Sequence, residues 1–402
     1  MSDRADVFIS GGGIAGLMAA LLFGRAGFQV ICVDPVPPVT DREAPGADLR
    51  STAFLQPARR TLEKAGIWPH VATYATPLQV MRLLDVSTSP PKCRDFDARD
   101  VSTQPFGWNL PNWLMRRELL NAIDDAPNVE LRVGVGLAAL REIDGSKQAR
   151  VVDLSDGTAV QAPLVIGADG RDSPTRKAIG VQANRVPFGQ KALAFAVTHP
   201  EPHQNVSTEV HDTGGPFTLV PLADVGDQHA SAIVWMDRAE VAEAMMALDT
   251  AAFELAMTER SHQVQGPLKL ASQRTIWPII TQLSERFFGP RVALVAEAAH
   301  VVPPIGAQGL NMSLADLAAL CDLARTYGTE GLGSEQMLRR YHSARFADVA
   351  ARLAGIFALN QASMLKLPLL RQARAHAMTG LHDLPPLRRT LMRLGLGAQP
   401  AR

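Results

Sequence analysis

Three glycines near the N-terminus have the spacing needed to hold a diphosphate. Gly11, Gly13 and Gly16 follow directly after the apolar stretch Ala5–Ile9 and form the pattern Gly-x-Gly-x-x-Gly. In such a turn the first glycine permits the tight bend, the second lets a pyrophosphate approach the backbone, and the third allows close packing. Asp34 follows further along, where its carboxylate can accept a hydrogen bond from a ribose hydroxyl. The pattern predicts a dinucleotide site, and a glycine turn without a ligand is the alternative.

The elements around this turn support the prediction. Ala5–Ile9 is expected to be a buried strand, Leu17–Phe23 a helix and Phe28–Val33 a second strand, which together make a βαβ unit. Ile14 and Ala15 lie at the expected start of the helix, where free backbone N–H groups attract a diphosphate. This motif alone does not distinguish NAD from FAD.

A second segment with polar residues comes after the hairpin predicted by Asp156-Gly157, with strands at Arg150–Leu154 and Thr158–Gln161. The apolar run Leu164–Ile166 then leads into Gly-Ala-Asp-Gly-Arg-Asp-Ser-Pro-Thr-Arg, in which Asp169 stands between a strand end and a helix start. An acid in that position can satisfy local backbone donors. The other interpretation is that it belongs to a second loop on the cofactor.

A third segment begins with the strand expected at 291–300, which has the acid Glu297 near its end, and continues into a loop rich in proline and glycine. An amphipathic helix is predicted from Met312 to about Tyr327. The backbone N–H groups at its start could stabilise negative charge on the ring edge of a reduced flavin. These groups belong to Gly309, Leu310 and Asn311.

The order of the three segments GGGIAG, ADGRDSPTR and AEAAHVVPPIGAQGLN resembles that of the class A flavoprotein aromatic monooxygenases, and more narrowly the ubiquinone-biosynthesis hydroxylases. Arg50–Phe54 and Pro111–Leu119 are similar to further segments of that family. The likeness covers nearly the whole chain. The three motifs together are specific for the superfamily and less specific for one substrate.

The resemblance implies FAD as the cofactor and NADH or NADPH as a transient electron donor. It implies hydroxylation of an aromatic ring with O2, with a lipophilic aromatic small molecule, a polyprenylated phenol of ubiquinone biosynthesis, as the substrate. The implied cofactor contacts are Gly11, Gly13, Ile14, Ala15 and Gly16 at the diphosphate, Asp34 at the adenosine ribose, Arg50 and Arg116 at the phosphate or adenine side, Asp169 at the loop shared by FAD and the nicotinamide, Glu297 at the ribityl chain, and Gly309, Leu310 and Asn311 at the flavin ring. No catalytic residue and no metal ligand is assigned.

The third motif departs from the commonest family pattern. Ala296-Glu297 stands where Gly-Asp is usual, and Pro303, Ala307 and Ser313 stand where His, Gly and Gly are frequent. Glu297 reaches one methylene further than aspartate and can still accept from a hydroxyl. Two alternatives therefore stay open: a non-catalytic or weakly active flavoprotein scaffold of a biosynthetic complex, and another FAD-dependent oxidoreductase.

The expected fold class is α/β, with a discontinuous Rossmann-like FAD-binding domain, an inserted mixed-sheet substrate domain and a helical C-terminus. Strand-like runs at 191–199, 217–222, 230–236 and 267–277, with helices at 238–248 and 250–262, indicate the substrate domain. The predicted division is 1–75, 101–180 and 278–340 for the FAD-binding domain, 76–100 and 181–277 for the substrate domain, and 341–402 for the C-terminal segment.

Composition excludes several other classes of protein. The 402 residues contain 40 Lys and Arg against 40 Asp and Glu, so no overall positive field favours nucleic acid. The cysteines Cys32, Cys93 and Cys321 are far apart, which argues against a disulfide framework or metal cluster. No apolar run reaches the 18 residues of a spanning helix. We expect a cytoplasmic protein, peripheral at a membrane at most, and the sequence leaves a homo-oligomer open.

The C-terminal segment is basic, with seven Lys or Arg and one acid in residues 366–402. Leu387, Leu391 and Leu394 make one stripe of an expected helix, with arginines beside or opposite it. Such a helix can lie on an anionic membrane or dock on a partner in a biosynthetic complex. More often it packs on its own domain with its charges in water.

Overall fold

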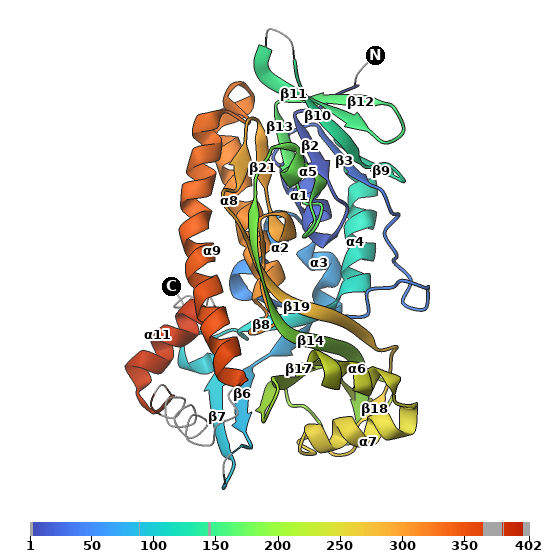
Figure 1. The fold of residues 1–402 in the computed structure, drawn as a ribbon, viewed down its shortest axis with the longest axis vertical. Helices are drawn as coiled ribbons and strands as arrows, with labels where there is room; N and C mark the ends of the chain where they lie inside the picture. The colour runs from blue at the N-terminus through green and yellow to red at the C-terminus, as the bar shows by residue number, and fades with distance from the viewer. Residues whose placement is uncertain (1–2, 88, 144–145, 365–379, 381, 397–402) are drawn as a thin grey trace.

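The computed structural model describes residues 3–87, 89–143, 146–364, 380 and 382–396. The molecule is elongated, with one large sheet in its upper half and another in its lower half (Figure 1). Helices α8 (Gln308–Gly331) and α9 (Glu335–Ser363) run along one side of it. The two large sheets form the opposite walls of the candidate site.

The upper sheet has six strands in the order β20-β21-β13-β2-β3-β9, parallel except for the edge strand β20. Its central strands are continuous apolar runs because both faces of the sheet are covered. The predicted βαβ unit is confirmed as β2, α1 (Ile14–Arg25) and β3. The strands are β20 (Phe288–Gly289), β21 (Val292–Leu294), β13 (Leu164–Gly167), β2 (Val7–Ser10), β3 (Val30–Asp34) and β9 (Val129–Val133).

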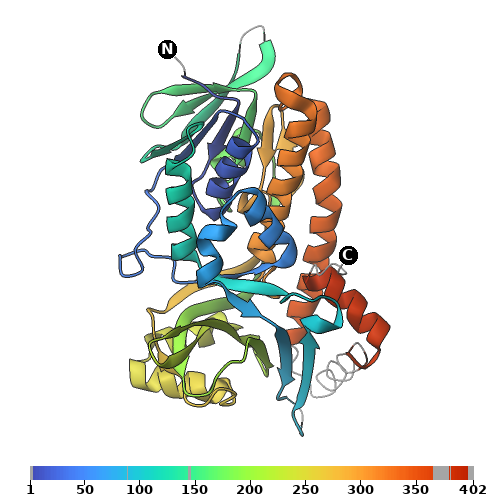
Figure 2. The same ribbon diagram turned by 180° about the vertical axis from the view of Figure 1, so that it is seen from behind.

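Helices α1 and α4 (Asn112–Asp124) cover one face of this sheet, as the rear view shows in blue and teal (Figure 2). Helices α2 (Gln56–Lys64) and α3 (Trp68–Val71) contact each other, and pack against α8 and α4 respectively. A four-stranded sheet packs against the upper part of the molecule and contains the predicted hairpin around Asp156-Gly157. Its strands are β1 (Asp3–Arg4), β12 (Ala159–Ala162), β11 (Ser146–Leu154) and β10 (Leu137–Ile143). Short α5 (Pro174–Ala178) follows β13.

The lower sheet has nine strands, with the path β22-β19-β14-β17-β16-β15-β6-β7 and β18 paired to β14. Three of the four predicted strands are confirmed within β14, β16 and β17. Both predicted helices are confirmed as α6 (Ala239–Ala247) and α7 (Thr250–Arg260), which are one or two residues shorter than predicted at their ends. The strands are β22 (His300–Val301), β19 (Thr275–Ser284), β14 (Ala183–His199), β17 (Gln228–Arg238), β16 (Pro216–Val225), β15 (Val206–His211), β6 (Val80–Asp85), β7 (Lys92–Asp97) and β18 (Lys269–Leu270).

The single strand predicted at 267–277 is wrong in its extent. The structure has the two-residue β18 and then β19, which continues to Ser284. The break occurs because the Ser272 hydroxyl accepts a hydrogen bond from the Ala196 backbone N–H at 2.8 Å, so a side chain takes a donor of β14. The spacing of apolar residues in the sequence does not reveal that a side-chain hydroxyl takes the place of a strand partner.

A small three-stranded sheet connects the two halves. Its strand order is β4-β8-β5, with β4 (Ser51–Leu55), β8 (Gly107–Pro111) and β5 (Thr76–Leu78). The predicted domain division stays a prediction. Two of its limits, after 277 and after 340, fall inside β19 and α9. One strand and one helix therefore run across these two predicted boundaries.

Helix α8 begins four residues earlier than predicted, at Gln308 instead of Met312. Its N-cap, Ala307, has the left-handed conformation with φ 56°, and Gly328 interrupts the helix with φ 63°. The early start places Gly309, Leu310 and Asn311 inside the first turn. None of the described helices is both long and apolar enough to cross a membrane.

The C-terminal helix α11 (Pro385–Leu396) packs on the rest of the chain through Met392, which is buried against a cluster that includes Leu55 and Phe106. Arg388 forms an ion pair with Asp100 at 3.0 Å. The side chains of Leu387 and Leu391 are exposed, and that of Leu394 lies outside the described residues. Part of the predicted stripe is therefore open to solvent.

Candidate functional site

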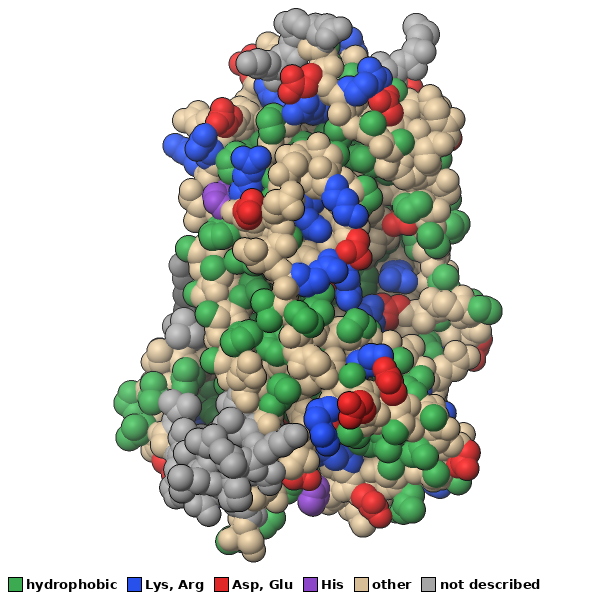
Figure 3. All heavy atoms as spheres, in the orientation of Figure 1, with side chains coloured by type: hydrophobic (Ala, Val, Ile, Leu, Met, Phe, Trp, Pro, Cys, Tyr) green, Lys and Arg blue, Asp and Glu red, His purple; other side chains and the backbone are tan. Residues whose placement is uncertain are grey.

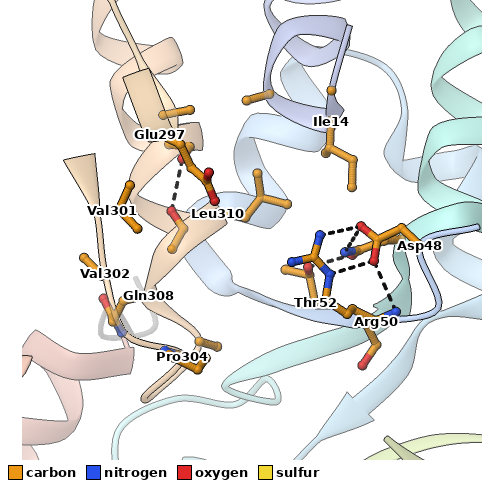
Figure 4. A pocket seen from close by; sticks show the side chains of 18 of the residues that line it. Ile14, Asp48, Arg50, Thr52, Glu297, Val301, Val302, Pro304, Gln308 and Leu310 are labelled. Carbon is orange, nitrogen blue, oxygen red and sulfur yellow. Dashed lines mark hydrogen bonds and ion pairs between the residues drawn. The ribbon is translucent and has the colours of Figure 1, made fainter. Parts of the chain in front are cut away.

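A cavity of about 890 Å³ lies between the two large sheets. It starts at the carboxyl ends of β2, β3 and β13, where open α/β sheets bind their ligands, and reaches the lower sheet. Figure 3 shows the face of the molecule as a mixture of acidic, basic and hydrophobic side chains. Figure 4 shows side chains from the loop before β4, from the loop before α8 and from α1 directed toward one another.

The glycine-rich turn has the backbone geometry that a diphosphate requires. Helix α1 begins after Gly13 with no side-chain cap and no acidic residue in its first turn, so its N–H groups are available to an anion. A Cβ added at Gly13 would meet nothing within 4 Å, whereas one at Gly11 would lie 2.4 Å from the Ala168 carbonyl oxygen. A Cβ at Gly16 would lie 1.8 Å from the Gly11 carbonyl oxygen. Gly13 is open to the cavity, and the other two are packing positions.

Asp34 lines the cavity at the end of β3. Its Oδ2 accepts a hydrogen bond from the Gly12 N–H at 2.5 Å, and its Oδ1 accepts one from the Val36 N–H at 2.8 Å. These two bonds fix the carboxylate beside the glycine turn. Each oxygen keeps a further lone pair for a ribose hydroxyl.

Asp169 also lines the cavity, but its carboxylate is used by the protein. It accepts hydrogen bonds from the hydroxyl groups of Ser10, Ser173 and Thr175, and from the Thr175 N–H at 2.9 Å. The structure thus gives Asp169 the local role that the sequence left open as one of two interpretations. Through Ser10 it also joins the first motif to the second.

Arg176 connects the second motif to the third through hydrogen bonds. Its Nη1 donates to the Ala298 carbonyl at 2.9 Å and its Nη2 to the Arg171 carbonyl at 2.8 Å. The side chain is buried, and burial lowers the pKa of its guanidinium. The three motifs that are distant in sequence therefore meet at neighbouring strand ends.

Sequence reasoning missed Asp48, which lines the cavity and contacts both predicted arginines, and Figure 4 shows it beside Arg50. Asp48 accepts two hydrogen bonds from the Arg50 side chain, both at 2.7 Å, and one from Asn112, and it lies 3.6 Å from Arg116. Burial opposes ionisation, but the hydrogen bonds and charges of Arg50, Asn112 and Arg116 outweigh it and hold the pKa of Asp48 below its ordinary value. The signal in the sequence that could have indicated this contact was the position of Asp48 two residues before Arg50.

The third motif contains strain at its unusual residue. Ala296 is buried and has φ 54°, a left-handed conformation that costs an L-residue about 1 kcal/mol or more relative to glycine. Glu297 lines the cavity, has a half-exposed side chain, and forms an ion pair with Arg171 at 3.4 Å. The Glu297 carboxylate is therefore accessible from the cavity. Ala296 adopts, at a cost in energy, a left-handed backbone conformation that glycine adopts freely.

The three residues predicted at the start of α8 have different surroundings in the structure. Gly309 and Leu310 line the cavity, and Asn311 does not. The Asn311 amide instead pairs with the edge strand β4: its Oδ1 accepts from the Leu55 N–H, and its Nδ2 donates to the Ala53 carbonyl, both at 2.8 Å. Asn311 therefore fixes the start of α8 against the small sheet.

His300 lines the cavity and belongs to a buried cluster of polar side chains beside α8. Its Nε2 lies 2.6 Å from Asp316 Oδ2, and Asp316 Oδ1 accepts a hydrogen bond from Arg345 at 2.8 Å. All three side chains are buried. These contacts hold the loop that follows the third motif onto α8 and α9.

Of the thirteen residues predicted to bind the cofactor, eleven line this one cavity and Gly16 and Asn311 do not. The residues that line it are Gly11, Gly13, Ile14, Ala15, Asp34, Arg50, Arg116, Asp169, Glu297, Gly309 and Leu310. The open Gly13, the uncapped α1 terminus and the fixed Asp34 suit the diphosphate and ribose of FAD.

Comparison with known proteins decides the family. Residues 4–354 match the family described as "FAD binding domain". The chain belongs to this family. It is an FAD-dependent monooxygenase of the aromatic hydroxylase type, with the mixed α/β class A fold.

Among its relatives, ubiquinone hydroxylase UbiL of Rhodospirillum rubrum is 29% identical over 99% of this chain and 92% of its own length. The 3-demethoxyubiquinol 3-hydroxylase of Escherichia coli is 26% identical over 98% of this chain and 99% of its own length. The crystal structure of p-nitrophenol 4-monooxygenase PnpA from Pseudomonas putida has a TM-score of 0.79 with 18% identity, and covers 100% of both chains. The likeness to the class A monooxygenases predicted from the motif order is confirmed.

Proposed function

We propose that this flavoprotein hydroxylates a lipophilic phenol of ubiquinone biosynthesis, a polyprenylated one, with O2 and with NADH or NADPH as the electron donor. The observation that carries the proposal is one continuous cavity, which joins the residues suited to FAD to a largely apolar wall of the lower sheet. The two ubiquinone-pathway relatives match almost the full chain and support this substrate class.

The roles of the chain's own residues follow from their places in the cavity. The start of α1 and Asp34 bind the diphosphate and ribose, and the first turn of α8 directs N–H groups of Gly309 and Leu310 toward the ring end. Apolar side chains such as Leu55, Val220 and Ile279 exclude water and accommodate a hydrophobic ring. FAD, when bound, supplies the redox chemistry that activates O2.

The test is reconstitution of the purified protein with FAD, followed by NADH or NADPH oxidation with and without a lipophilic phenol. We expect phenol-dependent oxidation, and one oxygen atom from ¹⁸O2 in the hydroxylated product. Deletion of the gene in its host should lead to accumulation of the quinone precursor that lacks this hydroxyl. NAD(P)H oxidation that no phenol stimulates, together with unchanged quinone in the deletion strain, would contradict the proposal.

A further inference from the structure

The wall of the cavity formed by the lower sheet is apolar with a few polar exceptions. On this wall β15 contributes Ser207 and Glu209, and β16 contributes Thr218. Asn109, from β8 of the small sheet, lines the same cavity. Among the described lining residues that come from the lower sheet, none is Lys or Arg. The cations of the cavity, Arg50, Arg116 and Arg171, belong to other segments.

Glu209 is a buried carboxylate with one oxygen left for a ligand. Its residue is 6% exposed, and it stands directly opposite Thr218 in the pairing of β15 with β16. His211 Nε2 lies 2.7 Å from Oε1 and fixes the carboxylate from the side. Within the described part of the chain Oε2 has no protein partner. A buried carboxylate facing an apolar cavity favours a hydrogen-bond donor there.

Asn109 supplies a second, independent sign of the same preference. Its residue is 1% exposed, and its Nδ2 donates to the Pro221 carbonyl at 2.9 Å. Because the nitrogen must face that carbonyl, the other amide atom is the oxygen, and Oδ1 is buried without a partner among the described residues. Buried acceptors are normally paired, so a ligand that donates a hydrogen bond suits this position.

We propose that Glu209 and Asn109 accept hydrogen bonds from hydroxyl groups on the substrate ring, and that Glu209 excludes rings that bear a carboxylate. This inference rests on the proposed function and narrows its substrate class to neutral phenols. A phenol hydroxyl donates to Oε2 and gains phenolate character, which makes the ring more electron-rich. A ring carboxylate offers only acceptors and a like charge, and none of the described cavity-lining residues of the lower sheet is a Lys or Arg that would neutralise it.

The experiment uses the FAD-loaded protein and three ligands that differ at one ring position: 4-propylphenol, 4-propylanisole and 4-propylbenzoate. Dissociation constants come from quenching of tryptophan fluorescence, since Trp277 lines the cavity, and from perturbation of the flavin spectrum. We expect the wild type to bind the phenol about tenfold or more tightly than the ether, as for a hydrogen bond to a charged group. The benzoate should bind more weakly than the phenol by a similar factor.

Glu209→Gln keeps the size of the side chain and removes its charge. It should weaken phenol binding, reduce the preference over the ether, and improve benzoate binding about tenfold. Glu209→Leu should reduce the preference for the phenol over the ether further than Glu209→Gln does, and leave only the share that Asn109 contributes. Glu243→Gln, which changes an exposed carboxylate paired with Lys191, is the matched control and should leave all three constants unchanged.

Equal binding of the phenol and the ether by the wild type overturns the inference while leaving the hydroxylase assignment intact. Tighter binding of the benzoate than of the phenol overturns it too. If the variants are misfolded, the three wild-type constants still decide. If none of the ligands binds and no phenol stimulates NAD(P)H oxidation, the proposed function fails with it.

Discussion

The contact between Asn311 and strand β4 allows a quantitative test of how the site is held together. β4 is the edge strand of its sheet, so one side of its backbone lacks a strand partner. The Asn311 amide pairs with the Leu55 N–H and the Ala53 carbonyl as a neighbouring peptide would, and it also donates to the Ala307 carbonyl at 2.6 Å. Asn311→Ala leaves two strand groups without their partner.

Each polar group left unpaired in a buried place costs about 1–3 kcal/mol. Leu55 is buried and Ala53 is half-buried, so water can compensate at Ala53 only. We therefore expect Asn311→Ala to lower the free energy of unfolding by about 2–4 kcal/mol. The affinity for FAD should fall as well, because the first turn of α8 lines the cavity.

Urea unfolding gives the stability, and hydrogen exchange followed by mass spectrometry gives the local effect. Amide exchange in the peptide that covers 51–56 should become faster in the variant. The control is Asn121→Ala, an exposed asparagine on α4, which should change stability by less than about 0.5 kcal/mol. An Asn311→Ala protein with wild-type stability and unchanged exchange in β4 would refute the reasoning.

Three further predictions concern the cofactor side of the cavity. Gly13→Asp should fold yet lose FAD, because its Cβ meets open space while its charge faces the diphosphate; flavin absorbance measures this, and the neutral Gly13→Asn should bind more FAD than Gly13→Asp. Ala296→Gly should change stability by less than about 1 kcal/mol, because relief of the left-handed strain offsets the lost methyl burial. Ala298→Gly, buried and without that strain, should cost about 1–2 kcal/mol in the same denaturation assay, and equal costs would contradict the strain argument. Asp48→Asn should lose about 1–2 kcal/mol at pH 7. Because the folded pKa of Asp48 is lowered, this difference should shrink as pH falls below its unfolded pKa. Urea unfolding at several pH values measures the difference, and a difference that stays constant with pH would contradict the prediction.

The sequence by itself determined the elements whose physical signals are local. Gly11, Gly13 and Gly16 predicted the turn before α1 because spacing and backbone freedom are properties of a few consecutive residues. The apolar runs likewise predicted β2, β3 and three of the nine strands of the lower sheet, β14, β16 and β17. The order of three such segments was sufficient to indicate the family.

Tertiary structure alone decided which side chains reach the cavity. Asn311 stands next to Leu310, yet its amide is used by β4, which is more than 250 residues away in sequence. Asp48 and Arg116 meet only because the loop before β4 lies against α4, and Glu209 enters the same cavity from the other sheet. Hydrogen-bond partners that are distant in sequence leave no periodic pattern, because what pairs them is the packing of sheets and helices against one another.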